Sequence, residues 1–243
     1  MTQDRKVLSL ALVAALSIIM MVGIVAANPD PFGAEISEGE EGRAESPNAQ
    51  SNDAIAGNVT GLTVEGESIT QSWQGYYGNV TGSITLADGS DNVMYNWSLA
   101  SPEGEIYAVN NSDNVDWKNI DCFDIGNASK VNSLESSYGI DADDIDGVNE
   151  TFNENNHEKF YVASQEFTSG QCRNAKIYDD TGTGVFDEVI LEDSGGQTIF
   201  MSILKEDVTG FDGNSHDFEM LVLEDGHGTD TATTPYFFYV ELE

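Results

Sequence analysis

The chain has 243 residues, with 43 acidic residues against nine lysines and arginines, so its formal net charge is −34. This balance argues against a nucleic-acid partner, because affinity for a phosphate backbone depends mainly on Lys and Arg contacts. Hydrophobic residues make up 40% of the chain and 24 glycines are spread along it, which suits a folded protein of one or two domains rather than a disordered polymer.

The N-terminal residues contain an uncharged apolar run from Val7 to Ala27, directly after Arg5 and Lys6. Its 21 residues would form a helix about 31 Å long, enough to cross a bilayer. The basic start and the small residues at the end are also typical of a cleaved secretory signal. Residues 1–27 are therefore predicted to be a signal peptide or an N-terminal membrane anchor. Both alternatives place the rest of the chain outside the cell.

Residues 28–54 are rich in Pro, Glu, Ser, Gly and Asn and contain almost no large apolar side chains. We interpret them as a disordered acidic linker between the apolar run and the first strand.

The acidity of the exported part favours a halophilic source. Residues 28–243 carry seven basic and 42 acidic residues, a net charge of −35. Molar salt shortens the screening length to about 3 Å, which relieves the self-repulsion of such a surface. The alternative is a low-salt protein whose carboxylates are neutralised by calcium.

From residue 55 onward the hydrophobic pattern has a period of two, with Val, Ile, Thr, Tyr and Phe recurring between Gly, Asn and Asp clusters. The turn residues after Leu86 predict a hairpin. Strands are predicted at 59–65, 79–87, 92–99, 104–109, 159–168, 173–178, 186–193, 197–205, 217–224 and 236–242. Between 112 and 158 the pattern weakens, and one short helix is predicted around 131–137 or 143–153.

Since no helix of more than about three turns is predicted after the linker, the fold class of residues 55–243 is all-β. An antiparallel β-sandwich is the economical architecture. It forms either one extended unit or two small lobes, with a sub-boundary in the region 111–158.

Three aromatic side chains, Trp73, Tyr76 and Tyr77, gather between glycines. Aromatic platforms bind sugar rings in lectin-like modules, and exposed rings also serve protein contacts. Packing in a core or hairpin is the commoner role of such a cluster. Glycan binding and packing both stay open here.

The segments 73–82 and 95–107 read WQGYYGNVTG and YNWSLASPEGEIY. They resemble segments of uncharacterised exported proteins of archaea, especially of haloarchaeal and related lineages. The resemblance implies a cell-surface or extracellular role, and it carries over no catalytic or ligand residue.

Archaeal pilins and archaellins also begin with an apolar segment and continue as a β-rich head. Their processing site has a basic residue followed by Gly just before the apolar run, whereas here Lys6 is followed by Val7. Pro29 and Pro31 would also interrupt a filament-forming helix. A pilin-like or adhesion filament subunit is therefore kept as an alternative function.

Two features fit an exported chain. Cys122 and Cys172 are the only cysteines, and a pair in an exported protein favours a disulfide over a metal site. Closing the 50-residue loop would contribute on the order of 4 kcal/mol. Asn-x-Ser/Thr sequons, which accept glycans in exported proteins, make up the second feature. They lie at Asn58, Asn79, Asn96, Asn110, Asn127 and Asn149.

One acidic loop follows the spacing of a calcium site, with Asp179, Thr181, Thr183 and Asp187 at the first, third, fifth and ninth positions. Two threonines supply fewer charges than calcium sites use, so a metal-free turn is the favoured alternative. The acidic run at 141–150 fails the register of an EF-hand and is interpreted as a solvated loop.

No catalytic motif rises above background. The histidines, His157, His216 and His227, form no zinc-binding pattern. His216 and Asp217 beside a serine (Ser202 or Ser215) lack the G-x-S-x-G elbow of hydrolases. The many acids are no argument for a glycosidase pair.

The chain is therefore predicted to be an exported, cell-surface, non-enzymatic protein of a halophilic archaeon, acting as an interaction or envelope component. A carbohydrate-binding module and a filament subunit are the alternatives. Calcium is the one cofactor considered.

Overall fold

The computed structural model describes residues 30–39, 41–45, 48–99, 103–111, 115–142, 144–228 and 231–242. The predicted signal peptide or anchor, residues 1–27, lies outside these ranges. Within them, no helix is both long enough and apolar enough to cross a membrane.

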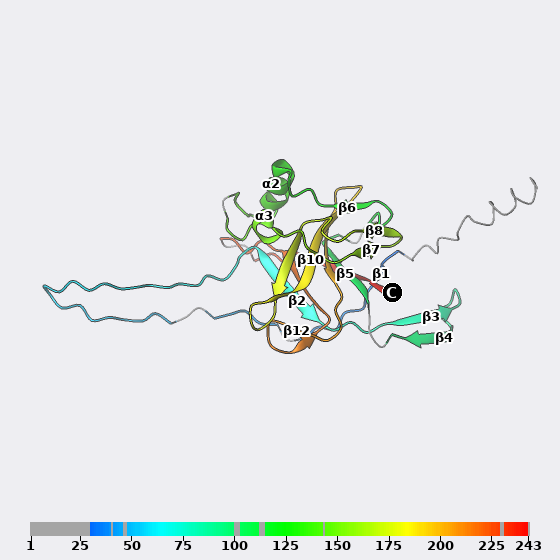
Figure 1. Ribbon diagram of the computed structural model, residues 1–243, viewed down its shortest axis with the longest axis horizontal. Helices are drawn as coiled ribbons and strands as arrows, with labels where there is room; N and C mark the ends of the chain where they lie inside the picture. Colours follow the sequence, from blue (N-terminus) through cyan, green and yellow to red (C-terminus); the bar gives the residue numbers. More distant parts are fainter. Residues whose placement is uncertain are drawn as a thin grey trace, which may run out of the picture.

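A seven-stranded antiparallel sheet forms the centre of the fold (Figure 1). Six strands follow the order β1-β15-β5-β11-β10-β6, and β9 also pairs with β10. Its strands are β1 (Phe32–Gly33), β5 (Gly104–Val109), β6 (Ile120–Cys122), β9 (Asn174–Tyr178), β10 (Gly184–Asp193), β11 (Thr198–Ile203) and β15 (Phe237–Leu242). Because β10 is ten residues long, β9 pairs with its first half and β6 with its end.

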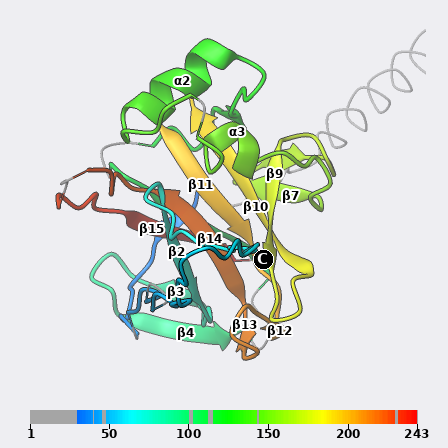
Figure 2. The same cartoon turned by 90° about the vertical axis from the view of Figure 1, so that its left-hand side faces the viewer.

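Four two-stranded pairs surround this sheet, and all four are antiparallel. They are β2 (Trp73–Gly78) with β14 (Phe218–Leu223), β3 (Ser83–Ala87) with β4 (Val93–Ser98), β7 (Phe160–Val162) with β8 (Gln165–Phe167), and β12 (Val208–Thr209) with β13 (Ser215–His216). Two short helices, α2 (Ala128–Ser136) and α3 (Val148–Thr151), lie near one end of β10 and β11 (Figure 2).

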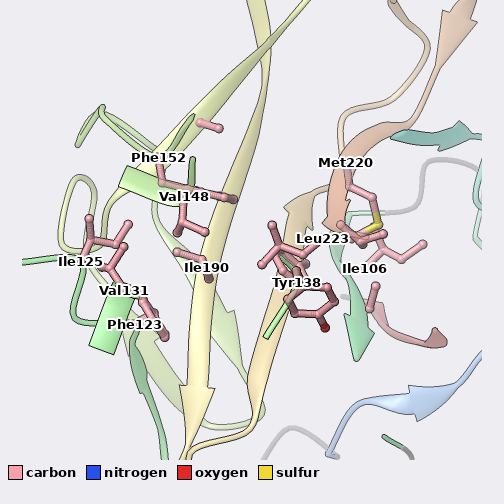
Figure 3. Close-up of a cluster of buried hydrophobic side chains, with 14 of the residues drawn as sticks. Ile106, Phe123, Ile125, Val131, Tyr138, Val148, Phe152, Ile190, Met220 and Leu223 are labelled. Carbon is pink, nitrogen blue, oxygen red and sulfur yellow. The ribbon is translucent and has the colours of Figure 1, made fainter. Parts of the chain in front are cut away.

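One face of the central sheet packs against the helices and β14. Ile190 of β10 lies beside Val148 and Phe152, and Met220 of β14 belongs to the same buried cluster (Figure 3). Phe200 of β11 completes this face of the sheet.

The opposite face of the sheet is buried as well. Leu191 and Met201, whose neighbours in sequence face the first cluster, pack with Phe160 and Phe167 of the β7–β8 hairpin. The rings of Phe160 and Phe167 stack with their centroids 4.7 Å apart. Burial on both faces explains the apolar runs Val189–Leu191 in β10 and Ile199–Met201 in β11.

The prediction of an all-β fold with antiparallel sheets is confirmed. Eight predicted strands coincide with observed ones within a few residues, from β3 to β15. The predicted strand 159–168 is instead the tight hairpin β7–β8, and 59–65 is exposed and belongs to no strand. Both alternatives for a helix in the irregular zone are partly realised, by α2 and α3.

Two residues of the predicted linker belong to the central sheet. Phe32 and Gly33 form β1, opposite Val240 and Tyr239 of β15, and the Ala34 amide donates to the Phe238 carbonyl at 2.9 Å. The chain therefore joins the sheet five residues after Ala27, and the described part of 35–70 forms no helix or strand.

The predicted disulfide between Cys122 and Cys172 is confirmed, with the two Cα atoms 5.2 Å apart. Cys122 is the last residue of β6, and Cys172 precedes β9. Since β6 and β9 both pair with β10, the bond joins two strands that share one neighbour.

Candidate functional site

The predicted calcium loop is the turn between β9 and β10. The Asp179 carboxylate accepts hydrogen bonds from the amides of Thr181 (2.9 Å) and Thr183 (2.8 Å) and from the Thr181 hydroxyl (2.7 Å). These bonds, the one from the Thr181 hydroxyl above all, lower the pKa of Asp179 because they favour its charged form. Gly182 takes a φ of +79°, which favours glycine in this turn.

Asp187, the fourth predicted calcium ligand, lies elsewhere in the fold. It is fully buried on β10, with Lys176 Nζ at 2.5 Å and Lys205 Nζ at 3.2 Å from its carboxylate. Asn174 also donates to it at 3.1 Å. The two ammonium groups compensate the buried charge. In the described ranges, no group of three or more His, Cys, Asp or Glu side chains is placed to hold a metal ion.

Two of the three predicted sugar-binding aromatics pack against the core. Trp73 Nε1 donates to the Asp146 carbonyl at 2.6 Å, and its ring lies 6.0 Å from that of Phe152. Tyr76 meets Phe238 edge to face at 5.2 Å. Both side chains are half-buried against the first cluster, which favours the packing role for them.

Tyr77 instead lies at the surface beside the exposed ring of Phe211 and the buried ring of His216. Phe211 lies 4.9 Å away and His216 4.8 Å away, measured between ring centroids. Tyr77 is 43% exposed and Phe211 is 53% exposed. We call Tyr77, Phe211 and His216 the Tyr77 patch. Gly210 has no room for a Cβ atom beside His216, so glycine is needed where the loop closes on the patch.

Two carboxyl groups border the Tyr77 patch. Asp212 Oδ1 lies 2.9 Å from His216 Nε2, and hydrogen bonds, first those from Asn214, lower the pKa of Asp212 to about 2. Glu219, opposite Tyr77 across β2 and β14, is buried, which raises its pKa. Its Oε1 accepts the Phe211 amide proton at 2.9 Å. The Tyr77 patch thus has two exposed aromatic rings, Tyr77 and Phe211, with one ionised carboxylate, Asp212, at its edge.

The residues of the hypothetical Ser-His-Asp arrangement have other partners. His216 pairs with Asp212, whereas Asp217 accepts the amides of Val80 (2.8 Å) and Asp207 (3.0 Å). The Ser202 hydroxyl donates to the Glu219 carbonyl at 2.9 Å.

The other two histidines also have local partners. His157 is buried, and its Nε2 accepts the Cys172 amide proton at 3.0 Å while Nδ1 lies 2.6 Å from the Glu158 carbonyl. His227 Nδ1 lies 3.2 Å from Asp225 Oδ1. His157 therefore holds the backbone next to the disulfide.

All six asparagines of the predicted sequons are exposed. Asn127 caps α2 by accepting the Lys130 amide proton at 3.3 Å, and Asn110 donates to the Tyr138 hydroxyl at 2.8 Å. Asn96 lies on β4 opposite Thr85. Accessibility at each position fits glycan attachment.

The sequence predicts the β3–β4 hairpin, but it does not reveal that the apolar side chains of this hairpin are exposed. Pairing places Ile84 opposite Trp97 and Leu86 opposite Tyr95, so these four side chains share one face. They are 50%, 50%, 51% and 58% exposed respectively, and the rings of Tyr95 and Trp97 are 4.8 Å apart. We call them the hairpin face.

The other side of the same hairpin is mostly polar. Ser83 pairs with Ser98 and Thr85 with Asn96. Val93 pairs with Ala87 on this side, and the register shifts at Met94, which is 81% exposed. The hairpin is therefore amphipathic, although every residue of both strands is exposed.

The hairpin projects from the end of the sheet where β15 terminates (Figure 1). At its base the Leu99 amide donates to the Gly82 carbonyl at 3.1 Å, and Gly82 lies directly against the Leu242 side chain. Val80, just before this base, is held by Asp217. The root of the hairpin is thus fixed, while its two strands extend away from the central sheet.

Two buried acids have a structural role inside the second cluster. Glu105 and Glu241 are direct partners across β5 and β15. Glu105 accepts the Tyr161 amide proton at 3.0 Å, and Glu241 accepts that of Ala163 at 2.8 Å. Both carboxyl groups therefore bind backbone amides along one edge of β7 and fix this strand against β5 and β15.

Comparison with known proteins finds no family model, no curated protein and no solved structure that matches this chain.

Proposed function

We propose that the chain is an exported, cell-surface β-sandwich protein of a halophile that acts without catalysis, as an interaction or envelope component. The observation that carries this proposal is the hairpin face. Ile84, Leu86, Tyr95 and Trp97 lie together on one side of a hairpin that projects from the fold, and each is at least half exposed. Contiguous apolar surface of this kind marks sites of contact with another molecule.

The acids that are most buried support a non-catalytic role. Glu105 and Glu241 bind backbone amides, and Asp187 is neutralised by two lysines. These carboxyl groups hold elements of the fold together, so they are engaged in structure rather than aimed at a substrate.

Halophily forms part of the proposal and rests on the net charge of −34. Dialysis from molar to millimolar KCl should destabilise the fold, because screening of the acidic surface is lost. Thermal melting that is unchanged between these salts would refute it.

The contact role is tested by hydroxyl-radical oxidation in the intact native envelope and in the purified protein at molar KCl. We expect Tyr95 and Trp97 to be protected in the envelope. Tyr178, which ends β9 and is 59% exposed, is the internal control and should be oxidised in both samples. Equal oxidation of Trp97 in both samples would overturn the proposed role of the hairpin face.

Glycan binding is a second candidate, and the exposed Tyr77 patch favours it. Exposed aromatic rings can stack on sugar rings. A carboxylate beside them, here that of Asp212, can accept hydrogen bonds from the sugar hydroxyls. Tyr77→Ala should abolish a glycan-array signal while leaving the fold intact. Trp73→Ala is the contrasting variant, because Trp73 packs in the core and its loss should lower stability. An array signal that survives Tyr77→Ala would remove the patch from consideration.

A further inference from the structure

The hairpin face lies at the same end of the sheet as the point where the chain joins it. In β1, Phe32 lies opposite Val240, and the antiparallel register directs the preceding residues towards Leu242. The base of the hairpin at Gly82 also touches Leu242. Figure 1 shows β1, the C-terminus and the β3–β4 hairpin on one side of the molecule.

The connection from the apolar run to this end is short. Four residues, 28–31, separate Ala27 from Phe32. Even fully extended, the chain from Ala27 to Phe32 spans about 17 Å. A membrane anchor formed by residues 7–27 would therefore hold this end of the sheet next to the bilayer, because the acidic segment after β1 does not act as a spacer.

The chemistry of the hairpin face suits a lipid surface. Trp and Tyr are enriched at membrane interfaces, where an apolar ring meets polar headgroups, and Ile and Leu add apolar area. Residues 82–99 contain no Lys or Arg, so attraction to anionic headgroups contributes nothing. The sequon at Asn96 lies on the opposite side, where a glycan would leave the hairpin face uncovered.

The size of the face also favours the bilayer over a second copy of the chain. Four half-exposed side chains offer on the order of 400 Å². This is about half of what one partner buries in a stable protein interface. A domain tethered beside its ligand needs little intrinsic affinity, because the tether supplies a high effective concentration.

We propose that the hairpin face, Ile84, Leu86, Tyr95 and Trp97, lies on the outer lipid surface of the membrane in which residues 7–27 are retained as an anchor. This deepens the proposed function by naming the partner of the same surface, and it rests on that function. Bound in this way, the domain would have one fixed orientation on the cell, with the Asn96 side facing away from the lipid.

The test uses the full chain reconstituted in phosphatidylcholine vesicles at molar KCl, with bromine on the acyl chains near the headgroups as a quencher. Flotation with the vesicles establishes insertion. We expect the emission contributed by Trp97, obtained as the difference between the natural chain and Trp97→Phe, to be at least halved by brominated lipid. The control is the double variant Trp97→Phe/Thr85→Trp, which moves the indole to the opposite side, where Thr85 pairs with Asn96, and should escape quenching.

Three results would overturn the inference. They are an unquenched Trp97, equal quenching of the indole on either side of the hairpin, and an intact mass from the native envelope that begins at Asn28. If Trp97 is protected in the native envelope yet unquenched by pure lipid, the contact role stands and the partner is not the lipid. If Trp97 is unprotected in the envelope, the proposed function itself fails.

Discussion

Strand β11 and the β3–β4 hairpin both carry large apolar side chains but have opposite environments. In β11, Phe200 faces one buried cluster and Met201 faces the other, and both are almost fully buried. In the hairpin, Trp97 and Asn96 lie on opposite sides and both are exposed. An isolated two-stranded hairpin is marginally stable in water, and the apolar side of this one lies outside the core.

The largest expected difference between the two regions is the cost of removing one ring. Phe200→Ala should lower the free energy of unfolding by about 3–5 kcal/mol, because it opens a cavity under β14 and the helices. Trp97→Ala should change it by no more than about 0.5 kcal/mol, since the side chain is half exposed in the free protein. Denaturant unfolding at molar salt measures both. A loss of about 2 kcal/mol or more in Trp97→Ala would show that the hairpin is part of the cooperative core.

Removing the disulfide should affect the central sheet but not the β3–β4 hairpin. Replacing both Cys122 and Cys172 by Ser should cost about 2–4 kcal/mol, because the unfolded chain regains the entropy of its loop. The bond joins β6 to the start of β9, far along the chain from the hairpin. Amide exchange in β3 and β4 should therefore stay the same while β6 and β9 exchange faster. Equal acceleration in the hairpin would contradict its independence.

The buried carboxyl group of Glu188 on β10 should make the stability of the core depend on pH. It is fully buried, and its Oε2 accepts the Leu221 amide proton at 2.8 Å. Burial raises the pKa of this carboxyl well above its usual value. The folded state therefore keeps a proton that the unfolded state releases, and stability falls as the pH rises through this window.

Glu188→Gln removes this titration. The variant should gain stability relative to the natural chain by about 1.4 kcal/mol for each pH unit above roughly 4.3, until the folded carboxyl ionises. Below that pH the difference between the two proteins should be constant. Unfolding curves from pH 4 to 7 measure it, and a difference that is flat over the whole range would mean that Glu188 is charged in the fold.

Five of the seven strands of the central sheet could be predicted from the sequence because their signal is local, whereas β1 and β6 were missed. Runs such as 104–109 and 197–205 show β-branched and aromatic residues between turn residues, whatever they later pack against. β1 was missed because two residues next to proline carry no such pattern, and β15 alone defines them as a strand. The segment 59–65 shows the reverse, an alternating pattern in a stretch that the structure leaves unpaired and exposed.

The candidate sites depended on contacts between distant parts of the chain. Nothing in the sequence places Phe211 against Tyr77, because the β12–β13 loop brings them together. The calcium hypothesis treated Asp187 as part of a loop, whereas β10 carries it to Lys176 and Lys205. The β3–β4 pairing could be predicted, but the exposure of Trp97 could not, since it depends on what the rest of the fold leaves uncovered.

The turn between β3 and β4 and the turn between β9 and β10 are closed by similar hydrogen bonds, and replacing the aspartate in each compares the two regions directly. Asp88 accepts the amides of Ser90 (2.9 Å) and Asn92 (3.0 Å) in the hairpin turn, much as Asp179 does for Thr181 and Thr183 between β9 and β10. In both turns hydrogen bonds to the carboxylate lower its pKa. The difference is that β9 and β10 are packed in the central sheet, while β3 and β4 depend on their own turn.

Asp88→Ala should therefore abolish amide protection throughout β3 and β4 without changing global unfolding. Asp179→Ala should leave the β9–β10 pairing protected, because burial of β10 on both faces holds it in register. Hydrogen exchange with mass analysis of the two hairpin peptides measures both. Loss of protection in the two variants alike would mean that turn chemistry, and not packing, maintains the strands of the central sheet. Retained protection in Asp88→Ala would mean that the hairpin is held by contacts with a neighbour in solution.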